Sequence, residues 1–259
     1  MRQSLIFALI LTVSSLALAQ GQPASDPQAL AFAAQSIAAI TGGSSVNDVT
    51  LTANAAWTGS DTETGNATLK ALGTGESRVD LVLSGGTRTE IRDASTGFAQ
   101  GKWTAQDGSS GPFESHNCFT DAVWFFPTLT SLSAGANVVL SYIGPETRNG
   151  TEVQHLQSYI YQPSQNAGGD PSPQQLSTMD FYLDASTLLP VAITYNMHPD
   201  EDANANILVE IDYSHYQMLG GVSVPLRIQR YSQGTLLLDL TVTSAEFNIG
   251  LALSTFAIN

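Results

Sequence analysis

The sequence has 259 residues and combines few charged side chains, 12% of the total, with a strongly acidic balance. Nine Lys and Arg residues stand against 23 Asp and Glu residues, which gives a formal net charge of −14. Because so few basic residues cannot form a positively charged stripe on the surface, we exclude a nucleic-acid-binding protein and a polybasic membrane anchor. The single cysteine excludes an internal disulfide and a thiolate metal cluster.

Residues 1–19 are predicted to be a secretory signal peptide. Arg2 supplies the positive start, residues 5–18 form the apolar stretch, and Ala17-Leu18-Ala19 matches an A-x-A cleavage site. This stretch is shorter than the roughly 20 residues that span a bilayer, and no later segment is long and apolar enough to do so. We therefore expect an exported, soluble chain, periplasmic or secreted, with a single domain over residues 20–259.

One amphipathic helix is predicted near the start of the exported chain. Asp26 can cap it, and Pro27 suits its first turn because the missing N–H has no partner there. Gly42-Gly43 is expected to end the helix at about Thr41. Helical spacing predicts an apolar face made of Leu30, Ala33, Ala34, Ile37 and Ala38.

After this helix the hydrophobic period changes to two, which is typical of half-buried strands. Turn sequences such as Asn149-Gly150 and Gly220-Gly221 separate the candidates. The alternation of apolar and polar residues predicts an antiparallel sheet with one face in water. The candidate strands span residues 49–57, 65–72, 77–84, 87–93, 97–106, 137–143, 151–162, 178–184, 190–197, 207–216, 222–231 and 235–247.

Two stretches interrupt the predicted strands. Residues 113–132 are rich in large apolar side chains and predict one or two short helices, stopped or kinked by Pro127. An exposed helix of this composition would aggregate, so we expect it to be covered, either as a fixed plug or as a lid that opens. Residues 163–175 form a polar loop that we expect to be exposed and mobile.

The sequence contains none of the common catalytic or phosphate-binding motifs, and we predict a protein that is not an enzyme and needs no cofactor or metal. The four histidines, at positions 116, 155, 198 and 215, never stand four residues apart. Asp184, Asp212 and His215 are acid–base candidates by residue type alone. Asp212 and His215 are three apart on a predicted strand, so they point to opposite faces.

Residues 200–206 are the one segment that resembles a cation site. Oxygen-bearing side chains at every second position are similar to the first half of a calcium loop. Ala205 stands where such a loop needs glycine, and Ile211 stands where it needs a bidentate glutamate. The pattern favours a solvated hairpin loop, with calcium binding as the alternative.

Four segments in the second half of the sequence resemble the periplasmic lipoprotein-carrier superfamily, the Lol-type proteins that sort outer-membrane lipoproteins. Residues 149–153 resemble its turn into a strand, and residues 181–191 resemble its Asp-Pro-x-Thr-Gly hairpin, with Leu188 in place of the glycine. Residues 213–225 and 247–258 resemble its last strands. Residues 20–135 match only in the order of their elements.

The resemblance implies a mainly β fold with a few helices. It implies a curved antiparallel sheet of about eleven strands, an unclosed half-barrel whose concave face is covered by helices. A non-enzymatic carrier of a hydrophobic ligand in the cell envelope, a lipid or the acyl chains of a lipoprotein, would use that face. The alternative is a structural or interaction module with a filled core and no ligand.

If the protein is such a carrier, we expect aromatic side chains from several parts of the sequence to line its cavity. Ordinary core packing is the alternative for each of these aromatic residues. Arg78 is the arginine that the resemblance suggests for the cavity. The expected partners are a hydrophobic ligand or a lipidated protein, and we expect a monomer. The aromatic candidates are Trp57, Trp103, Trp124, Phe125, Phe126 and Tyr142.

Overall fold

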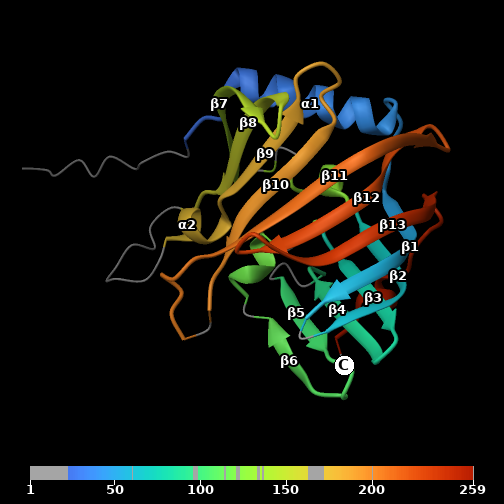
Figure 1. Ribbon diagram of the computed structural model, residues 1–259. Coiled ribbons are helices and arrows are strands. Elements are labelled where there is room, and N and C mark those ends of the chain that lie inside the picture. The colour runs from blue at the N-terminus through green and yellow to red at the C-terminus, as the bar shows by residue number, and fades with distance from the viewer. Residues whose placement is uncertain are drawn as a thin grey trace, which may run out of the picture.

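The computed structural model describes residues 23–258, except 60, 96–98, 114, 121–122, 133–134, 136, 163–171 and 200. Its core is one antiparallel sheet that curves strongly and stays open (Figure 1). The strand order is β6-β5-β4-β3-β2-β1-β13-β12-β11-β10-β9-β8-β7. The described residues therefore confirm the predicted half-barrel, with thirteen strands in the sheet instead of about eleven.

The predicted strands form with small shifts at their ends, and the sequence analysis missed β6, Ser110–Phe113. This strand has four residues and contains Gly111 and Pro112, so it carries no alternating pattern. The other strands are β1 Asp48–Thr58, β2 Thr62–Leu72, β3 Ser77–Leu83, β4 Gly86–Asp93, β5 Gln100–Thr104, β7 Val138–Arg148, β8 Thr151–Ile160, β9 Met179–Asp184, β10 Pro190–Met197, β11 Ile207–Leu219, β12 Val222–Ser232 and β13 Thr235–Phe247.

The sheet consists of two meanders that meet in its middle, where β1 pairs with β13. The first meander runs outward from β1 and ends at one edge of the sheet, β6. The second begins at the opposite edge, β7, and returns to the middle. The chain between β6 and β7 must therefore connect the two outermost strands of the half-barrel.

Helix α1, Pro27–Thr41, has the predicted bounds. The Asp26 carboxylate accepts a hydrogen bond from the Gln28 N–H at 2.7 Å, and Gly42 ends the helix with φ +61°. The predicted apolar face is partly wrong, because Ala34 and Ala38 are exposed. Alanine occurs all round this helix, so its spacing marks no single face. The buried residues are Ala29, Ala33, Ser36, Ile40 and Thr41.

Helix α1 lies along one end of the second meander (Figure 1). Its start is fixed to the edge strand β7, since the Asp26 N–H donates to the Leu140 carbonyl at 2.8 Å. Near its end the Ser223 hydroxyl of β12 donates to the Ala39 carbonyl at 3.1 Å. Fifteen residues extend about 22 Å, close to the roughly 24 Å that separate β7 from β12 across five strand spacings. One helix therefore spans this half of the sheet and leaves the remaining apolar surface for another cover.

The tight turns follow from local sequence. In the β7–β8 hairpin Asn149 and Gly150 have φ of +50° and +82°, the mirror-image turn that matches the twist of the strands. Leu188, where the family resemblance would place glycine, also adopts a positive φ of +58°. The Asp184 carboxylate supports this turn by accepting hydrogen bonds from Ser186 and Thr187, which lower its pKa. The hydrogen bonds of Asp184 therefore stabilise this turn.

A second, smaller apolar cluster lies on the outer, convex face of the sheet. A bulge at Tyr142–Gly144 interrupts the β7–β8 pairing, and Arg148 near the hairpin tip contacts Glu210 on β11. The Arg148 guanidinium lies 4.2 Å from the centre of the Tyr182 ring. The tip therefore covers this cluster, which comprises Val153, Tyr182, Ala192 and the half-buried Val191.

Asp212 of β11, close to Glu210, predicts an unusual pH dependence of stability. Burial, with Glu210 beside it, raises the pKa of Asp212 to about 6, above the roughly 3.9 of an unfolded aspartate. Asp212 is half-buried and binds its proton more tightly when the protein is folded. Its contribution to stability is therefore complete below about pH 4 and is lost as the pH rises through about 6.

The Asp212→Asn variant keeps a neutral side chain at every pH and isolates this contribution. Its free energy of unfolding should gain on that of the wild type by on the order of 1 kcal/mol between pH 4 and pH 7, because partial exposure screens the effect. Urea denaturation at a series of pH values measures the difference. A constant difference over this range would mean that Asp212 titrates normally in the folded protein.

Candidate ligand site on the concave face

Every second residue of the strands points into the curve of the sheet, and on this face most are apolar and buried. The alternation that predicted one dry face thus holds across both meanders. Val79 and Leu81 of the first meander and Phe181 and Ile193 of the second belong to one contiguous core cluster. Further members include Val49, Leu51, Leu69, Leu140, Leu156, Ile211, Ile228 and Leu240.

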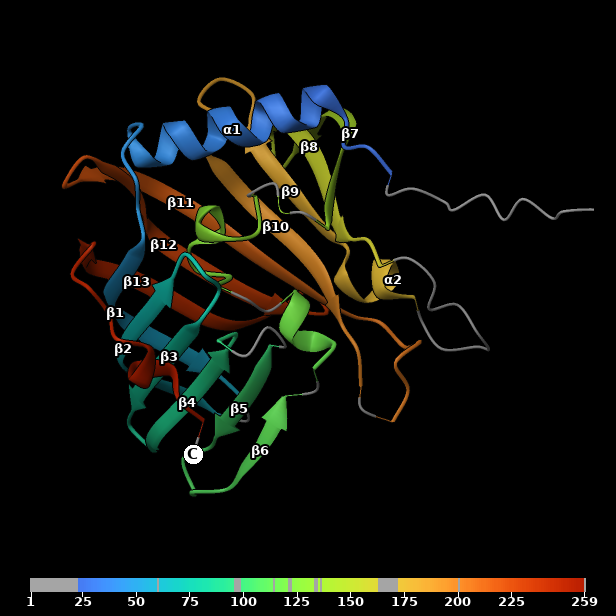
Figure 2. The same cartoon turned by 180° about the vertical axis from the view of Figure 1, so that it is seen from behind.

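The connection between β6 and β7 crosses this face, and we call its residues 117–120 and 123–132 the cover segment. Figure 2 places it in green inside the curve of the sheet. It forms two single-turn 3-10 helices, Asn117–Phe119 and Pro127–Leu129, so Pro127 begins a turn and stops none. Phe119 is half-buried, and the other large apolar side chains of the segment are at most 8% exposed: Val123, Trp124, Phe125, Phe126, Leu129 and Leu132.

Aromatic contacts fix the centre of the cover segment to the sheet. The Trp124 and Phe125 rings meet edge to face with centroids 5.5 Å apart, and Phe126 lies 6.0 Å from Phe247 of β13. The Tyr213 hydroxyl donates a hydrogen bond to the Trp124 carbonyl. Burial raises the pKa of Tyr213 well above its usual value, so this hydroxyl keeps its proton and remains a donor.

Asn117 fastens the start of the cover segment to the loop after β10. Its side-chain amide donates to the His198 carbonyl and accepts from the His198 N–H, each at 2.9 Å. The Arg92 guanidinium of β4 donates to the neighbouring Cys118 carbonyl at 2.7 Å. The cover segment is therefore held by side-chain contacts at its start and at its centre.

Asn117→Ala removes both hydrogen bonds to His198, which leaves the His198 N–H without its partner and the His198 carbonyl with only the His116 ring nitrogen, at 3.2 Å. We expect the free energy of unfolding to fall by about 2–4 kcal/mol, and the cover amides to exchange faster than in the wild type. Hydrogen exchange read by mass spectrometry separates the cover segment from the strands. Thr178→Ala is a control, because it deletes one exposed hydrogen bond to Gln174. Equal exchange of the cover in both variants would mean that Asn117 does not hold it.

Among the described residues, little free space remains beside Trp124 under the cover segment. The void beside Trp124 measures about 20 Å³ and is lined also by Val79, Glu90, Arg92 and Phe113. This volume holds about one water molecule, whereas pockets for organic ligands measure roughly 300–1,000 Å³. A hydrophobic ligand can therefore reach the concave face only if the cover segment moves.

A second pocket, of about 200 Å³, lies where the β2–β3 turn approaches the opposite edge of the sheet. Phe119, Thr130 and Ser131 of the cover segment form one wall. The other walls come from Thr74, Gly75, Arg92, Val138, Ser158, Tyr159, Ile160, Ser177 and Met179. We call this space the mouth pocket. It also touches the short helix α2, Pro173–Ser177, whose first residues belong to the loop predicted over residues 163–175. The rest of that loop, 163–171, lies outside the described residues.

Comparisons with known proteins agree with this architecture. No family model and no curated protein matches the sequence. An outer membrane lipoprotein-sorting protein domain from Vibrio parahaemolyticus superposes with a TM-score of 0.51 at 12% identity, covering 88% of this chain and 95% of its own. A DUF1329 family protein from Desulfovibrio piger superposes with a TM-score of 0.53 at 11% identity, covering 91% and 98%. The chain has the Lol-type fold.

The Lol-type half-barrel brings five of the seven expected cavity residues into one cluster. Trp124, Phe125 and Phe126 come from the cover segment, while Trp57 of β1 and Tyr142 of β7 are half-buried against the core. Trp103 of β5 pairs with Glu90 but is 36% exposed and lies outside this cluster.

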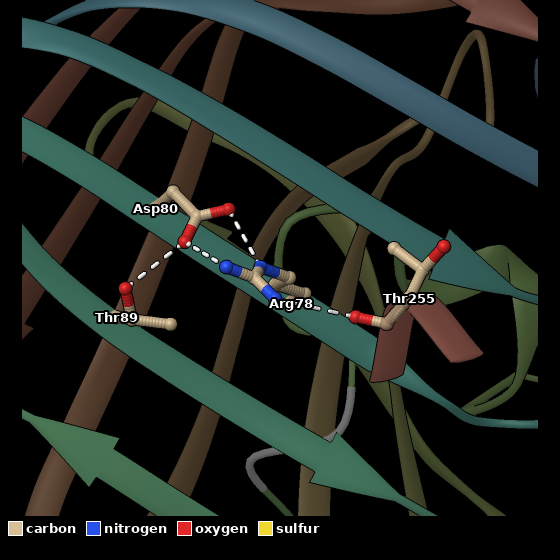
Figure 3. Close-up of polar contacts among 4 residues, drawn as sticks. All are labelled: Arg78, Asp80, Thr89 and Thr255. Atoms are coloured by element: carbon tan, nitrogen blue, oxygen red, sulfur yellow. Dashed lines mark hydrogen bonds and ion pairs between the residues drawn. The ribbon is translucent and has the colours of Figure 1, made fainter. Parts of the chain in front are cut away.

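Arg78 does not join them. It follows the buried Ser77 and precedes the buried Val79 on β3, so its side chain lies on the convex face. There it forms a bidentate pair with Asp80 at 2.7 and 2.9 Å, and Thr89 donates to the same carboxylate (Figure 3). It also donates to the Thr255 carbonyl at 3.4 Å, which ties down the C-terminal turn Leu253–Phe256.

The structure places three other arginines on the concave face, and the sequence analysis missed them. Arg88 and Arg92 lie on β4, and Arg230 lies on β12. On β12 the alternation Val222, Val224, Leu226, Ile228 continues to position 230, so Arg230 falls on the predicted apolar face. The sequence signal that could have found Arg230 is its position, two residues after Ile228 in the apolar alternation.

The other candidate groups lie at separate places in the described part of the chain. No group of three or more His, Cys, Asp or Glu side chains there could hold a metal ion. His155 contacts Asp180 at 2.8 Å, and His116 and His198 lie with ring centroids 6.0 Å apart. His215 is exposed, beside the Ser214 hydroxyl. In the acidic loop, Asp202 caps a turn, and Asp200 lies outside the described residues.

Proposed function

We propose that this protein is an exported, non-enzymatic binder or carrier of a hydrophobic ligand, and that the ligand occupies the concave face after the cover segment moves aside. The observation that supports this proposal most is that the cover segment has little regular secondary structure. The apolar centre of the sheet is closed by a connection whose described residues have two single turns of 3-10 helix as their regular structure. Such a segment has few internal hydrogen bonds to lose when it leaves the sheet.

Two features of the cover segment support movement. Val123 has a φ of +50°, which is costly for a β-branched residue, so the closed conformation holds backbone strain of about 1–3 kcal/mol. The mouth pocket of about 200 Å³ adjoins the same segment and has apolar walls from Val138, Ile160 and Met179. An alkyl chain can begin to enter there and release the strained segment from one side.

Identification of bound molecules tests this proposal. The protein is purified without detergent from the compartment to which it is exported, denatured and extracted with organic solvent, and the extract is analysed by mass spectrometry. A lipid or fatty acid recovered at close to one equivalent supports the proposal. A parallel preparation of an unrelated exported protein measures carry-over. An extract no richer than that control, together with no binding of added lipid, contradicts the proposal.

The alternative function is a structural or interaction module with a filled core. The near absence of space under the cover segment favours it, because the described residues leave only about 20 Å³ beside Trp124. In that case the cover segment is a permanent part of the core. Its amides would then exchange as slowly as those of β12 and β13, with or without lipid.

Export is part of the proposal and depends on residues 1–19, which lie outside the described residues. No helix in the described part of the chain is long and apolar enough to cross a membrane. We expect the exported form to begin near Gln20. N-terminal sequencing of protein recovered from the periplasm or medium measures this, and an intact Met1 on a membrane-bound protein would contradict it.

A further inference from the structure

The His198 ring contains a buried nitrogen without a hydrogen-bond partner. His198 follows β10, is 2% exposed, and its Nδ1 lies 3.1 Å from the Ala205 carbonyl oxygen. A carbonyl oxygen only accepts, so Nδ1 carries the proton of the neutral ring and Nε2 carries the lone pair. This Nε2 is enclosed and has no partner among the described residues. A buried acceptor without a donor is costly, so a group from outside the chain that takes this lone pair would stabilise the fold.

A second imidazole lies beside the first. His116 immediately precedes the cover segment, and its ring centroid is 6.0 Å from that of His198, with 68° between the ring planes. The His116 Nε2 lies 3.2 Å from the His198 carbonyl oxygen, so it donates its proton there and leaves the lone pair of the neutral ring on Nδ1. Each of the two neutral rings therefore has one nitrogen that can coordinate a metal ion.

The separation of the two rings suits one shared ion. With metal–nitrogen bonds of about 2.0–2.1 Å and a ring radius of about 1.1 Å, two coordinating imidazoles place their centroids about 5–6.5 Å apart, from the tetrahedral to the linear arrangement. The observed 6.0 Å falls in this range. Coordination requires both lone pairs to face the ion, and the half-buried His116 ring is the one that can turn to do so. Solvent reaches that side of the pair, so an ion can enter there.

The surroundings of the two rings are those that metal-binding histidines use. Such a histidine almost always donates its other ring N–H to a carbonyl or a carboxylate, which fixes its tautomer and orientation. The carbonyls of Ala205 and His198 supply these acceptors here. The Asn117 amide also bonds the His198 N–H and carbonyl, each at 2.9 Å. The loop that carries one ring is therefore already fixed to the segment that carries the other.

We propose that His116 and His198 together bind a divalent transition-metal ion of the class that prefers imidazole, represented by Zn²⁺ and Cu²⁺. The described residues include no metal-binding group of three or more His, Cys, Asp or Glu side chains, so water completes the coordination and the ion exchanges readily. The ion joins two chain positions that are 82 residues apart and strengthens the attachment of the cover segment at its start. This inference goes beyond the proposed function and does not depend on it.

Titration calorimetry of the full exported chain, produced without a polyhistidine tag, tests the proposal with Zn²⁺, Cu²⁺ and Mg²⁺ as separate probes. We expect one equivalent of Zn²⁺ to bind with a Kd of about 100 µM or lower, and Cu²⁺ to bind more tightly. Mg²⁺ prefers oxygen ligands and should not bind. Hydrogen exchange gives an independent readout, because saturating Zn²⁺ should slow the amides of residues 117–120 more than those of β12 and β13.

His116→Gln and His198→Gln each remove one of the two protein ligands and should each weaken Zn²⁺ binding about tenfold or more. Circular dichroism checks that both variants fold. His116 is half-buried, so its variant keeps the test decisive if the buried His198→Gln variant does not fold. His215→Gln is the matched control, because it removes an exposed imidazole on β11 and should leave Zn²⁺ binding within about twofold of the wild type.

Three outcomes overturn the proposal. Zn²⁺ binding that survives unchanged in both His116→Gln and His198→Gln places the ion elsewhere, and so does binding that is lost in His215→Gln. A Kd for Zn²⁺ above about 1 mM in the wild type means adventitious binding only. Each of these results leaves the proposed function untouched, because no alkyl-chain ligand takes part in the experiment.

Discussion

Replacing Trp124 by alanine should lower the free energy of unfolding by about 3–5 kcal/mol, which is typical of a large buried aromatic side chain. Trp124 is 2% exposed, meets Phe125 edge to face and covers the Arg230 guanidinium. The cavity left by the indole cannot close easily, because strands line it on two sides. Urea denaturation followed by circular dichroism measures the loss.

Trp103→Ala is the control for this experiment. Trp103 is 36% exposed on β5, so the same truncation should cost clearly less, on the order of 1 kcal/mol. Phe126→Ala, at 2% exposure, should resemble Trp124→Ala. A loss below about 1 kcal/mol for both Trp124→Ala and Phe126→Ala would mean that the cover segment does not pack on the sheet as described.

Gly65→Ala should be the most damaging small substitution in the sheet. Gly65 of β2 pairs with Leu83 of β3, and a Cβ atom there would lie 1.9 Å from the Val82 carbonyl oxygen and 2.9 Å from the Leu83 Cα. These are backbone atoms of a paired strand, so they cannot move aside without breaking the β2–β3 ladder. We expect a loss of about 3 kcal/mol or more, measured by thermal or urea unfolding.

Gly73→Ala provides the matched control, because the nearest atom to its added Cβ, the Asn47 carbonyl oxygen, is at an ordinary 3.4 Å. This variant should unfold within about 0.5 kcal/mol of the wild type. Equal stability of the two variants would mean that β2 and β3 do not approach each other as closely at Gly65 as the structure has them.

The parts of the fold that could be predicted are those written in local sequence. Asp26, Pro27 and Gly42 set the ends of α1 because capping and left-handed turns depend on neighbouring residues. Period-two alternation located twelve strands for the same reason. Strand β6 escaped because its four residues, with Gly111 and Pro112, are too short to show a period.

The candidate site depends on contacts that no local pattern encodes. The order of the strands puts β6 and β7 at opposite edges, so the connection between them must pass from one edge to the other, and its described residues 117–120 and 123–132 lie on the concave face. Arg230 and Glu90 are 140 positions apart in the sequence and meet across the half-barrel. Arg78 is the exception, because the local alternation against Val79 is enough to place it on the convex face.

Hydrogen exchange of the cover segment, with and without an added alkyl-chain ligand, tests the central claim most directly. The proposed function predicts that amides of residues 123–132 exchange faster than those of β12 and β13 in the free protein. It also predicts that a saturating alkyl-chain ligand changes exchange in the cover segment and leaves both strands unchanged. Slow exchange of the cover segment, equal to that of the two strands and unaffected by every chain tested, would contradict it.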